Sequence, residues 1–190
     1  MIEYRKKCCL LIFEEESDRN TYLELASREG ASKAEELYYN NLRSTAQALQ
    51  ELPFAATVWL REKSTSDSIW GNAKQEVMQG QTPSERIAFA FKKAFDEGYR
   101  KVILLKGDCP GISIAILEEA FLALKIIEFS IGLNDRGGYY QLGMNQFEPA
   151  ILNQDDWDAP DLGKKIIRSI GDLKMALYKT KMLPVIDKLQ

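Results

Sequence analysis

Residues 101–111 read KVILLKGDCPG, in which the apolar run Val102 to Leu105 changes abruptly into a polar turn. A short continuous apolar run is typical of a strand covered on both faces of a sheet. Lys106, Gly107 and Asp108 then stand at the carboxyl end of that strand. Ligands of open α/β sheets bind beyond the carboxyl ends of the strands, so Asp108 is the first candidate site residue.

The segments around this strand alternate between strand and helix patterns. KKCCLLIF at residues 6–13 predicts a second buried strand, which we place at the centre of the sheet. Thr82, Pro83 and Glu85 predict a helix start with a capping box, and Gly98 ends that helix. Further strands are expected at 54–60, 129–133, 139–142 and 173–178, and further helices at 20–28, 32–52, 114–125 and 162–170. This alternation predicts a three-layer α/β/α sandwich with a mostly parallel sheet and one local antiparallel pair.

Two connecting regions carry more specific expectations. Ser32 and Glu35 match the S-x-x-E capping box, which predicts the start of the helix over 32–52. Residues 61–81 are polar and long for a plain connection, so we expect a functional loop that overhangs the site.

Composition limits the classes of partner. At 190 residues and 45% hydrophobic content, the chain is expected to form a single domain over residues 1–190. A formal charge of −3 and a pI near 5.2 argue against nucleic acid as a partner. Because apolar runs stay well below the length of a membrane span, we expect a cytoplasmic protein.

The sequence offers few kinds of side chain that could act in catalysis or bind a metal. The sequence has no histidine, which excludes Ser-His-Asp hydrolysis and His-ligated zinc. Its three cysteines do not predict a disulfide framework, and Cys109 has no histidine base to activate it. Carboxylates must therefore carry any acid, base or metal chemistry.

Several short motifs follow one another along the chain: LLIF at 10–13, Ala34 with Leu37-Tyr38, Gln79-Gly80 with Ser84-Glu85-Arg86, Gly107-Asp108-Cys109-Pro110, Gly137-Gly138-Tyr139-Tyr140 with Leu142-Gly143, and Trp157. In this order and spacing the chain resembles small bacterial glycosyltransferase-like proteins of the nucleotide-diphospho-sugar transferase fold, type GT-A. The resemblance runs from the first strand nearly to the C-terminal end.

The resemblance implies a nucleotide-sugar donor, an acceptor that it does not identify, and Mg²⁺ or Mn²⁺ as the metal. Asp108 would be the metal ligand and a catalytic residue, with Asp187 as a second catalytic carboxylate. The nucleotide side would comprise Gln79, Gly80 and Arg86, and the acceptor or sugar side would comprise Gly137, Gly138, Tyr139 and Trp157. We add Lys106 to the nucleotide side, and Asp135 and Arg136 to the acceptor side, from their positions next to these residues.

The chain also departs from the family pattern. The family follows its first strand with a loop that ends in Lys-Thr-Arg-Leu, whereas Asn20 and Tyr22 stand at the Lys and Arg positions here. Arg136 stands where the family has an Asp before Gly-Gly-Tyr, and Lys106 replaces a small residue. The cations Lys106 and Arg136 either neutralise phosphate or pair with Asp108 and Asp135.

Each candidate also has a structural explanation. Asp108 can end a strand by forming a side-chain turn, Arg86 can be a surface residue, and Gly137-Gly138 can be a hairpin turn. Two hypotheses for function therefore stay open: a metal-dependent nucleotide-sugar transferase, and a catalytically reduced binding or regulatory protein on the same scaffold. A flavodoxin-like module ranks below both, because Glu14-Glu15-Glu16 lacks the partners that such a site needs.

Overall fold

The computed structural model describes residues 7–14, 19–50, 52–61, 69–71 and 73–184. Within these residues, seven strands form one sheet in the order β3-β2-β1-β4-β6-β5-β7. Strand β6 is antiparallel to both β4 and β5, and every other neighbouring pair is parallel. The strands are β1 (Cys8–Glu14), β2 (Ala55–Leu60), β3 (Lys74–Val77), β4 (Lys101–Lys106), β5 (Phe129–Leu133), β6 (Tyr139–Met144) and β7 (Leu177–Lys179).

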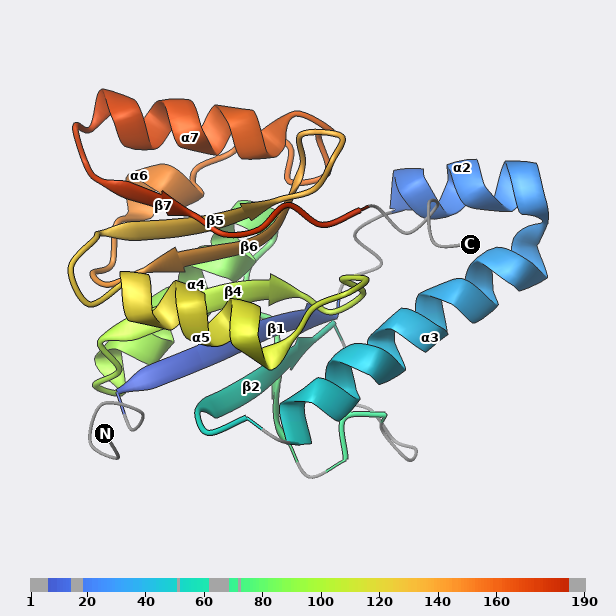
Figure 1. Ribbon diagram of the computed structural model, residues 1–190, viewed down its shortest axis with the longest axis horizontal. Helices are drawn as coiled ribbons and strands as arrows, with labels where there is room; N and C mark the ends of the chain where they lie inside the picture. Colours follow the sequence, from blue (N-terminus) through green and yellow to red (C-terminus); the bar gives the residue numbers. More distant parts are fainter. Residues whose placement is uncertain (1–6, 15–18, 51, 62–68, 72, 185–190) are drawn as a thin grey trace.

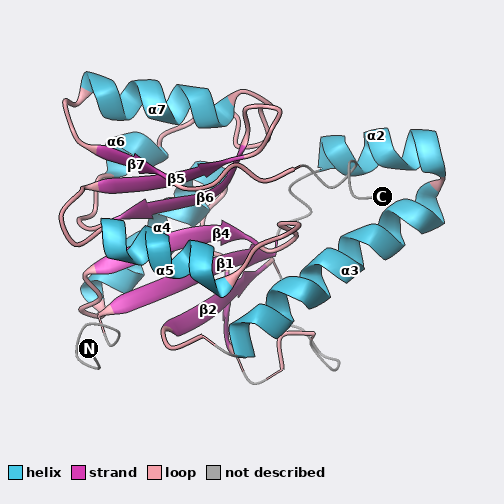
Figure 2. Cartoon of the chain, in the orientation of Figure 1, coloured by secondary structure: helices cyan, strands magenta, loops and turns pink. Residues whose placement is uncertain are grey.

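Helices cover both faces of this sheet, as Figures 1 and 2 show. One face packs against α4 (Pro83–Asp96), α6 (Pro149–Leu152) and α7 (Leu162–Asp172). The other packs against α3 (Ala31–Gln50) and α5 (Ile114–Ala123). Helix α2 (Arg19–Glu29) packs on α3 rather than on the sheet, through a small cluster that includes Leu25 and Ala34.

Strand β1 supplies both halves of the core. Its side chains alternate, so that Cys8 and Leu10 join one apolar cluster while Cys9 and Leu11 join the other. All three cysteines are buried and free, as the sequence predicts. Burial raises the pKa of the Cys9 thiol to about 12, which keeps it protonated and unreactive at neutral pH.

The predicted three-layer α/β/α sandwich with a mostly parallel sheet and a local antiparallel pair is confirmed. The expected position of β1 was wrong, because β4 lies at the middle of the sheet with three strands on each side. Among the described residues, no helix is long and apolar enough to cross a membrane.

The start of α3 differs from the expected capping box. Helix α3 begins at Ala31, so Ser32 lies inside the helix. The reason is Gly30, whose φ of +93° ends α2 in the left-handed region. The Gly30 amide donates to the Ala26 carbonyl at 3.0 Å, and its carbonyl accepts from Ala34 at 3.1 Å, so one glycine closes one helix and opens the next.

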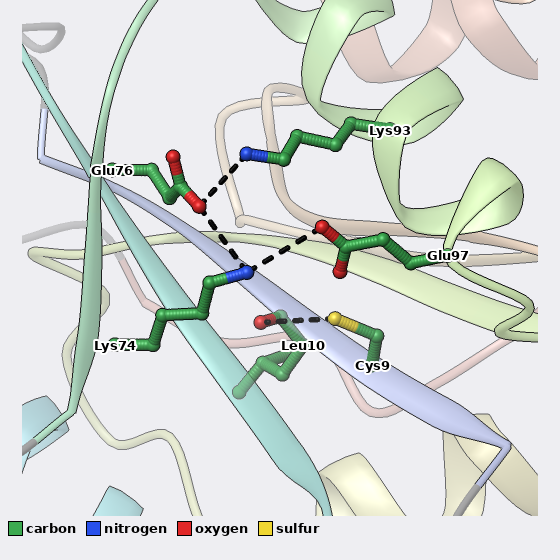
Figure 3. A network of polar contacts seen from close by, with 6 residues as sticks. All are labelled: Cys9, Leu10, Lys74, Glu76, Lys93 and Glu97. Atoms are coloured by element: carbon green, nitrogen blue, oxygen red, sulfur yellow. Dashed lines mark hydrogen bonds and ion pairs between the residues drawn. The ribbon is translucent and has the colours of Figure 1, made fainter.

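The expected loop over residues 61–81 was also wrong in part, because it contains the edge strand β3. Figure 3 shows how charged side chains attach this polar strand to α4. The Glu76 carboxylate accepts from Lys93 at 2.8 Å and lies 3.2 Å from the Lys74 ammonium, which reaches Glu97 at 3.5 Å. These polar residues form a strand although they lack the apolar pattern of a buried strand, because ion pairs attach them to α4.

The C-terminal elements shift relative to the prediction. Helix α7 extends to Asp172, and Lys174, with a φ of +56°, turns the chain before β7 begins at Leu177 rather than at Leu173. The short helix α6 was not predicted, since four residues are too few to show a helical period.

Gly132 on β5 offers a test of packing between the sheet and the C-terminal segment. A Cβ at Gly132 would overlap the ring of Tyr140, whose hydroxyl is held by Thr180 and by the Lys181 carbonyl. Gly132→Ala is therefore expected to lower the free energy of unfolding by about 1–3 kcal/mol in urea denaturation. Gly171→Ala is the matched control, because nothing lies within 4 Å of its Cβ position. Equal stability of the two variants would contradict the tight packing of Tyr140 on Gly132.

Candidate functional site

In the described part of the chain, six strands end, and the antiparallel β6 begins, at one edge of the sheet, which we call the carboxyl edge. The chain leaves β1 towards β2 on one side and leaves β4 towards β5 and β6 on the other, so the connections diverge between β1 and β4. Such a switch point is where open α/β sheets leave a crevice for ligands.

Gly107 draws the chain against the end of β1 at this point. Its amide donates to the Phe13 carbonyl at 3.0 Å. A Cβ at Gly107 would lie 3.1 Å from the Phe13 oxygen, 3.2 Å from Leu42 Cδ2 and 3.5 Å from the ring of Trp70. The close approach at this position therefore favours glycine, and Trp70 is buried against the turn.

Asp108 and Cys109 follow at once, and both are buried, with Asp108 only 6% exposed. Cys109, for which the sequence offers no histidine base, is thus a buried free thiol. A buried carboxylate at a strand end is costly unless polar or cationic groups face it. Among the described residues, Asp108 is the one acidic residue that is buried, so solvent alone does not stabilise its charge.

Lys106 begins a chain of contacts along the carboxyl edge. Its ammonium nitrogen lies 5.2 Å from the ring centroid of Tyr139 on β6, a cation–π contact. Tyr139 meets Trp157 edge to face, with ring centroids 5.6 Å apart. The Trp157 indole nitrogen donates to Ser84 Oγ at 2.8 Å. The end of β4, the start of β6 and the first turn of α4 are therefore joined through side chains.

The glycine pair belongs to a turn that Asn134 organises. Asn134 Oδ1 accepts from the amides of Arg136 at 3.1 Å and Gly138 at 2.9 Å. Gly137 has a φ of +98°, and a Cβ at Gly138 would lie 2.8 Å from Asn134 Nδ2. Sequence analysis overlooked Asn134, although an Asn that begins a turn before glycines is its recognisable signal.

The turn leaves its charged side chains outside. Asp135 and Arg136 are exposed, while Gly137 and Gly138 are buried. The predicted acceptor side therefore presents a rigid backbone turn with a carboxylate and a guanidinium at its surface.

Arg86 holds the chain that precedes α4. Its Nε donates to the Gly80 carbonyl at 3.2 Å and its Nη2 donates to the Gln81 carbonyl at 3.1 Å. Gly80 has a φ of +131°, and a Cβ there would lie 2.9 Å from the Arg86 amide. Gln79 is exposed next to this turn. Arg86 thus shapes the turn, which is a structural task besides any contact with a ligand.

The structure brings only part of the predicted set together. Tyr139 contacts both Lys106 and Trp157, and Asp108 lies two residues after Lys106 at the switch point, separated from it by Gly107. Asp187 lies outside the described residues, as do residues 15–18 of the loop that follows the first strand. Asn20 and Tyr22 lie in helix α2, where the family pattern has a loop. Among the described residues, no group of three or more acidic or cysteine side chains forms a metal cluster.

With this geometry in place, comparison with known proteins gives three kinds of result. The family model described as "Uncharacterized protein conserved in bacteria (DUF2064)" matches residues 41–159. A comparison with curated proteins gives no match. Several solved structures share the fold over nearly the whole chain.

A candidate nucleotide-diphospho-sugar transferase from Desulfovibrio desulfuricans G20 has a TM-score of 0.83 and 22% identity, covering 96% of this chain and 83% of that one. 4-Diphosphocytidyl-2C-methyl-D-erythritol synthase from Anaerococcus prevotii DSM 20548 has a TM-score of 0.56 and 12% identity, covering 95% and 89%. Rv0371c from Mycobacterium tuberculosis H37Rv, in complex with manganese, has a TM-score of 0.55 and 11% identity, covering 95% and 89%. At these identities the likeness shows the fold, which is the one expected from the sequence.

Glu85 gives a pH-dependent test of the turn before α4. The amides of Gln81 and Thr82 donate to its carboxylate at 2.7 and 3.2 Å, and these bonds lower its pKa below the ordinary value of 4.5. A depressed folded-state pKa stabilises the fold above the ordinary value and loses this effect as pH falls through the lowered value. Glu85→Gln should therefore lower the melting temperature at pH 7, with a difference from the unsubstituted chain that disappears in acid.

The control for this comparison is Glu36→Gln, because Glu36 is exposed on α3 and its side chain makes no hydrogen bond or ion pair within the described part of the chain. Melting curves between pH 3 and pH 7 should show no such difference for this variant. A Glu85 effect that persists unchanged in acid would contradict the carboxylate's role in the turn.

Proposed function

Because this chain belongs to the bacterial family described as "Uncharacterized protein conserved in bacteria (DUF2064)" and has the nucleotide-diphospho-sugar transferase fold, we propose that it is a sugar transferase. In this proposal, the carboxyl edge binds a nucleotide-diphospho-sugar together with a divalent cation. The sugar is then transferred to an acceptor hydroxyl.

The position of Asp108 is the observation that carries this proposal. Asp108 is a buried carboxylate at the carboxyl end of β4, next to the switch point of the sheet. The glycine turn before it is fixed by the Gly107–Phe13 hydrogen bond, so the carboxylate is preorganised rather than carried on a mobile loop. A preorganised carboxylate at the ligand crevice suits a metal-bound diphosphate.

The donor set fits Mg²⁺ or Mn²⁺ only as a cation shared with the substrate. Mg²⁺ is commonly held by one or two carboxylates together with substrate phosphates. Asp108 offers one carboxylate, and no cluster of three such ligands exists among the described residues. Asp108 would therefore hold a cation that arrives with the nucleotide, and that cation would neutralise the diphosphate leaving group.

The neighbouring side chains have separate tasks in this proposal. Lys106, held against the Tyr139 ring, would face the phosphates as a fixed positive charge. The turn of Gln79 and Gly80, shaped by Arg86, would border the nucleotide. Tyr139 and Trp157, with the turn from Asp135 to Gly138, would border the sugar and the acceptor. Asp187 would be the second carboxylate of the reaction.

A specific observation also favours the second hypothesis, a binding or regulatory protein without transferase activity. Glu85 and Arg86 are both engaged in holding the turn before α4, and no group of three acidic or cysteine side chains in the described residues is placed to hold a metal ion. Such a protein would retain the crevice and bind a ligand there without transferring it. Ligand binding followed by a turnover assay separates the two hypotheses.

Asp108→Asn tests the metal-bound diphosphate. In calorimetric titrations with UDP, GDP, CDP and dTDP, each with and without Mg²⁺ or Mn²⁺, we expect the unsubstituted chain to bind one of them in a metal-dependent way. Asp108→Asn should weaken that binding by at least about tenfold, equivalent to about 1.4 kcal/mol. The melting temperature should change little, because Asn keeps the shape of Asp.

The matched control is Asp172→Asn, which removes an exposed carboxylate at the far end of α7, an 11-residue helix that spans roughly 15 Å. It should bind as the unsubstituted chain does. A folded sample that binds none of the four nucleotides would overturn the proposal. A large loss of thermal stability in Asp108→Asn would instead assign Asp108 to the fold.

Lys106→Met tests the fixed positive charge. We expect the affinity for the same nucleotide to fall by about tenfold both with and without metal, because a charged contact to phosphate is lost in each case. Lys92→Met, on the exposed side of α4 where Lys92 pairs with Asp96, is the control. If Lys106→Met binds the nucleotide as tightly as the control does, Lys106 only packs on the Tyr139 ring and does not contact the nucleotide.

A further inference from the structure

The segment after β7, Thr180–Leu183, runs beside the end of β5 and contacts the turn that carries the proposed sugar side. We call it the C-terminal strap. The Thr180 amide donates to the Ile131 carbonyl at 3.0 Å, and the Leu183 amide donates to the Leu133 carbonyl at 3.1 Å. The strap thereby continues the parallel pairing of β7 with β5 beyond the end of the strand. In Figure 1 it is the red segment that leaves β7 towards the C-terminal end.

The strap holds the Asn134 turn directly. The Asp135 amide donates to the Leu183 carbonyl at 3.1 Å, and Asn134 forms a parallel bridge with Leu183. The same turn contains Gly137 and Gly138, whose amides are held by the Asn134 carbonyl and side chain. One side of the turn is thus fixed by Asn134 and the other by the strap.

Leu183 also reaches the loop that follows Asp108. Its side chain is buried in the apolar cluster that contains Cys109 and Ile112, and a Cβ at Gly111 would lie 3.9 Å from Leu183 Cδ2. The strap therefore packs against both loops of the candidate site. The Leu183 side chain meets the loop over residues 107–113, which we call the Asp108 loop, and the strap backbone meets the Asn134 turn, residues 134–138. A displacement of the strap would change how these two loops face each other.

Tyr140, on β6, fastens the strap to the sheet through its hydroxyl group. Its hydroxyl lies 2.7 Å from Thr180 Oγ1 and donates to the Lys181 carbonyl at 2.7 Å. Gln141 Nε2 donates to the same Thr180 oxygen at 3.4 Å. Tyr140 is buried, and burial raises its pKa to about 12, so its hydroxyl stays a proton donor at neutral pH. Gly132 provides the space for the ring.

We infer that Tyr140 is a positioning residue of the candidate site: its hydroxyl fastens the C-terminal strap, and the strap fixes the Asn134 turn opposite the Asp108 loop. Tyr140 acts through the strap and touches no substrate. The part of this inference that concerns ligand affinity rests on the proposed nucleotide-sugar site. The part that concerns the turn can be tested on the chain alone.

Tyr140→Phe removes the hydroxyl and keeps the ring. In amide hydrogen exchange of the ligand-free chain, we expect Asp135 and Gly138 to exchange about fivefold faster, the effect of one lost buried hydrogen bond. Amides of α4 should keep their exchange rates. Thr180→Val should show the same faster exchange. In Thr180→Ser, which keeps the hydroxyl, these amides should exchange at nearly the rate of the unsubstituted chain.

Tyr178→Phe is the matched control. Tyr178 donates its hydroxyl to Glu119 on α5 at 2.6 Å, so this variant loses a tyrosine hydroxyl bond near the strap without releasing the strap. Exchange at Asp135 and Gly138 should not change in this variant. Unchanged exchange of these two amides in Tyr140→Phe, or an equal increase in Tyr178→Phe, would overturn the inference.

The affinity measurement is made separately, with whichever of UDP, GDP, CDP or dTDP the unsubstituted chain binds. Tyr140→Phe should weaken that binding several-fold while Tyr178→Phe does not, since only the first loosens the turn. Full affinity in a Tyr140→Phe chain with a loosened turn would overturn the link to the site. Failure of the unsubstituted chain to bind overturns the proposed function, whereas the exchange experiment still decides whether Tyr140 fixes the turn.

Discussion

The hydrogen bond from the Gly107 amide to the Phe13 carbonyl joins the ends of β1 and β4, and the rest of the carboxyl edge depends on it. The two strands pair in parallel from Cys8 to Phe13, and this bond extends their pairing one residue into the turn. The approach is so close that a side chain at Gly107 would meet backbone and Leu42. Asp108 consequently follows β4 from a fixed point at the carboxyl edge rather than from a free loop.

The antiparallel insertion of β6 between β4 and β5 is the second constraint. Because β6 runs against its neighbours, it begins where they end, and Tyr139 arrives beside Lys106 at the carboxyl edge. The aromatic contact with Trp157 and the hydrogen bond to Ser84 then bring the first turn of α4 to the same edge. A sheet with β6 in parallel would have placed this tyrosine at the opposite end.

Few reactive side chains lie at this edge among the described residues. One buried carboxylate, one cation against an aromatic ring and a glycine turn take the place of a crowded acidic metal centre among the described residues. In the proposed function, this set would bind a nucleotide diphosphate that brings its own charge and cation. The C-terminal strap holds the Asp108 loop and the Asn134 turn in place, because it contacts both of them and is itself hydrogen-bonded to Tyr140.

The sequence by itself determined the elements whose signals are local. The apolar runs of β1 and β4, the capping box at Thr82 and the strand-end position of Asp108 follow from neighbouring residues, and the alternation of elements predicted the sandwich. Only the tertiary structure decided the strand order, the strand β3 held by Lys74 and Glu76, the role of Asn134 and the contacts of the strap. These features depend on hydrogen bonds and ion pairs between residues far apart in the chain, and such contacts leave no periodic pattern in the sequence.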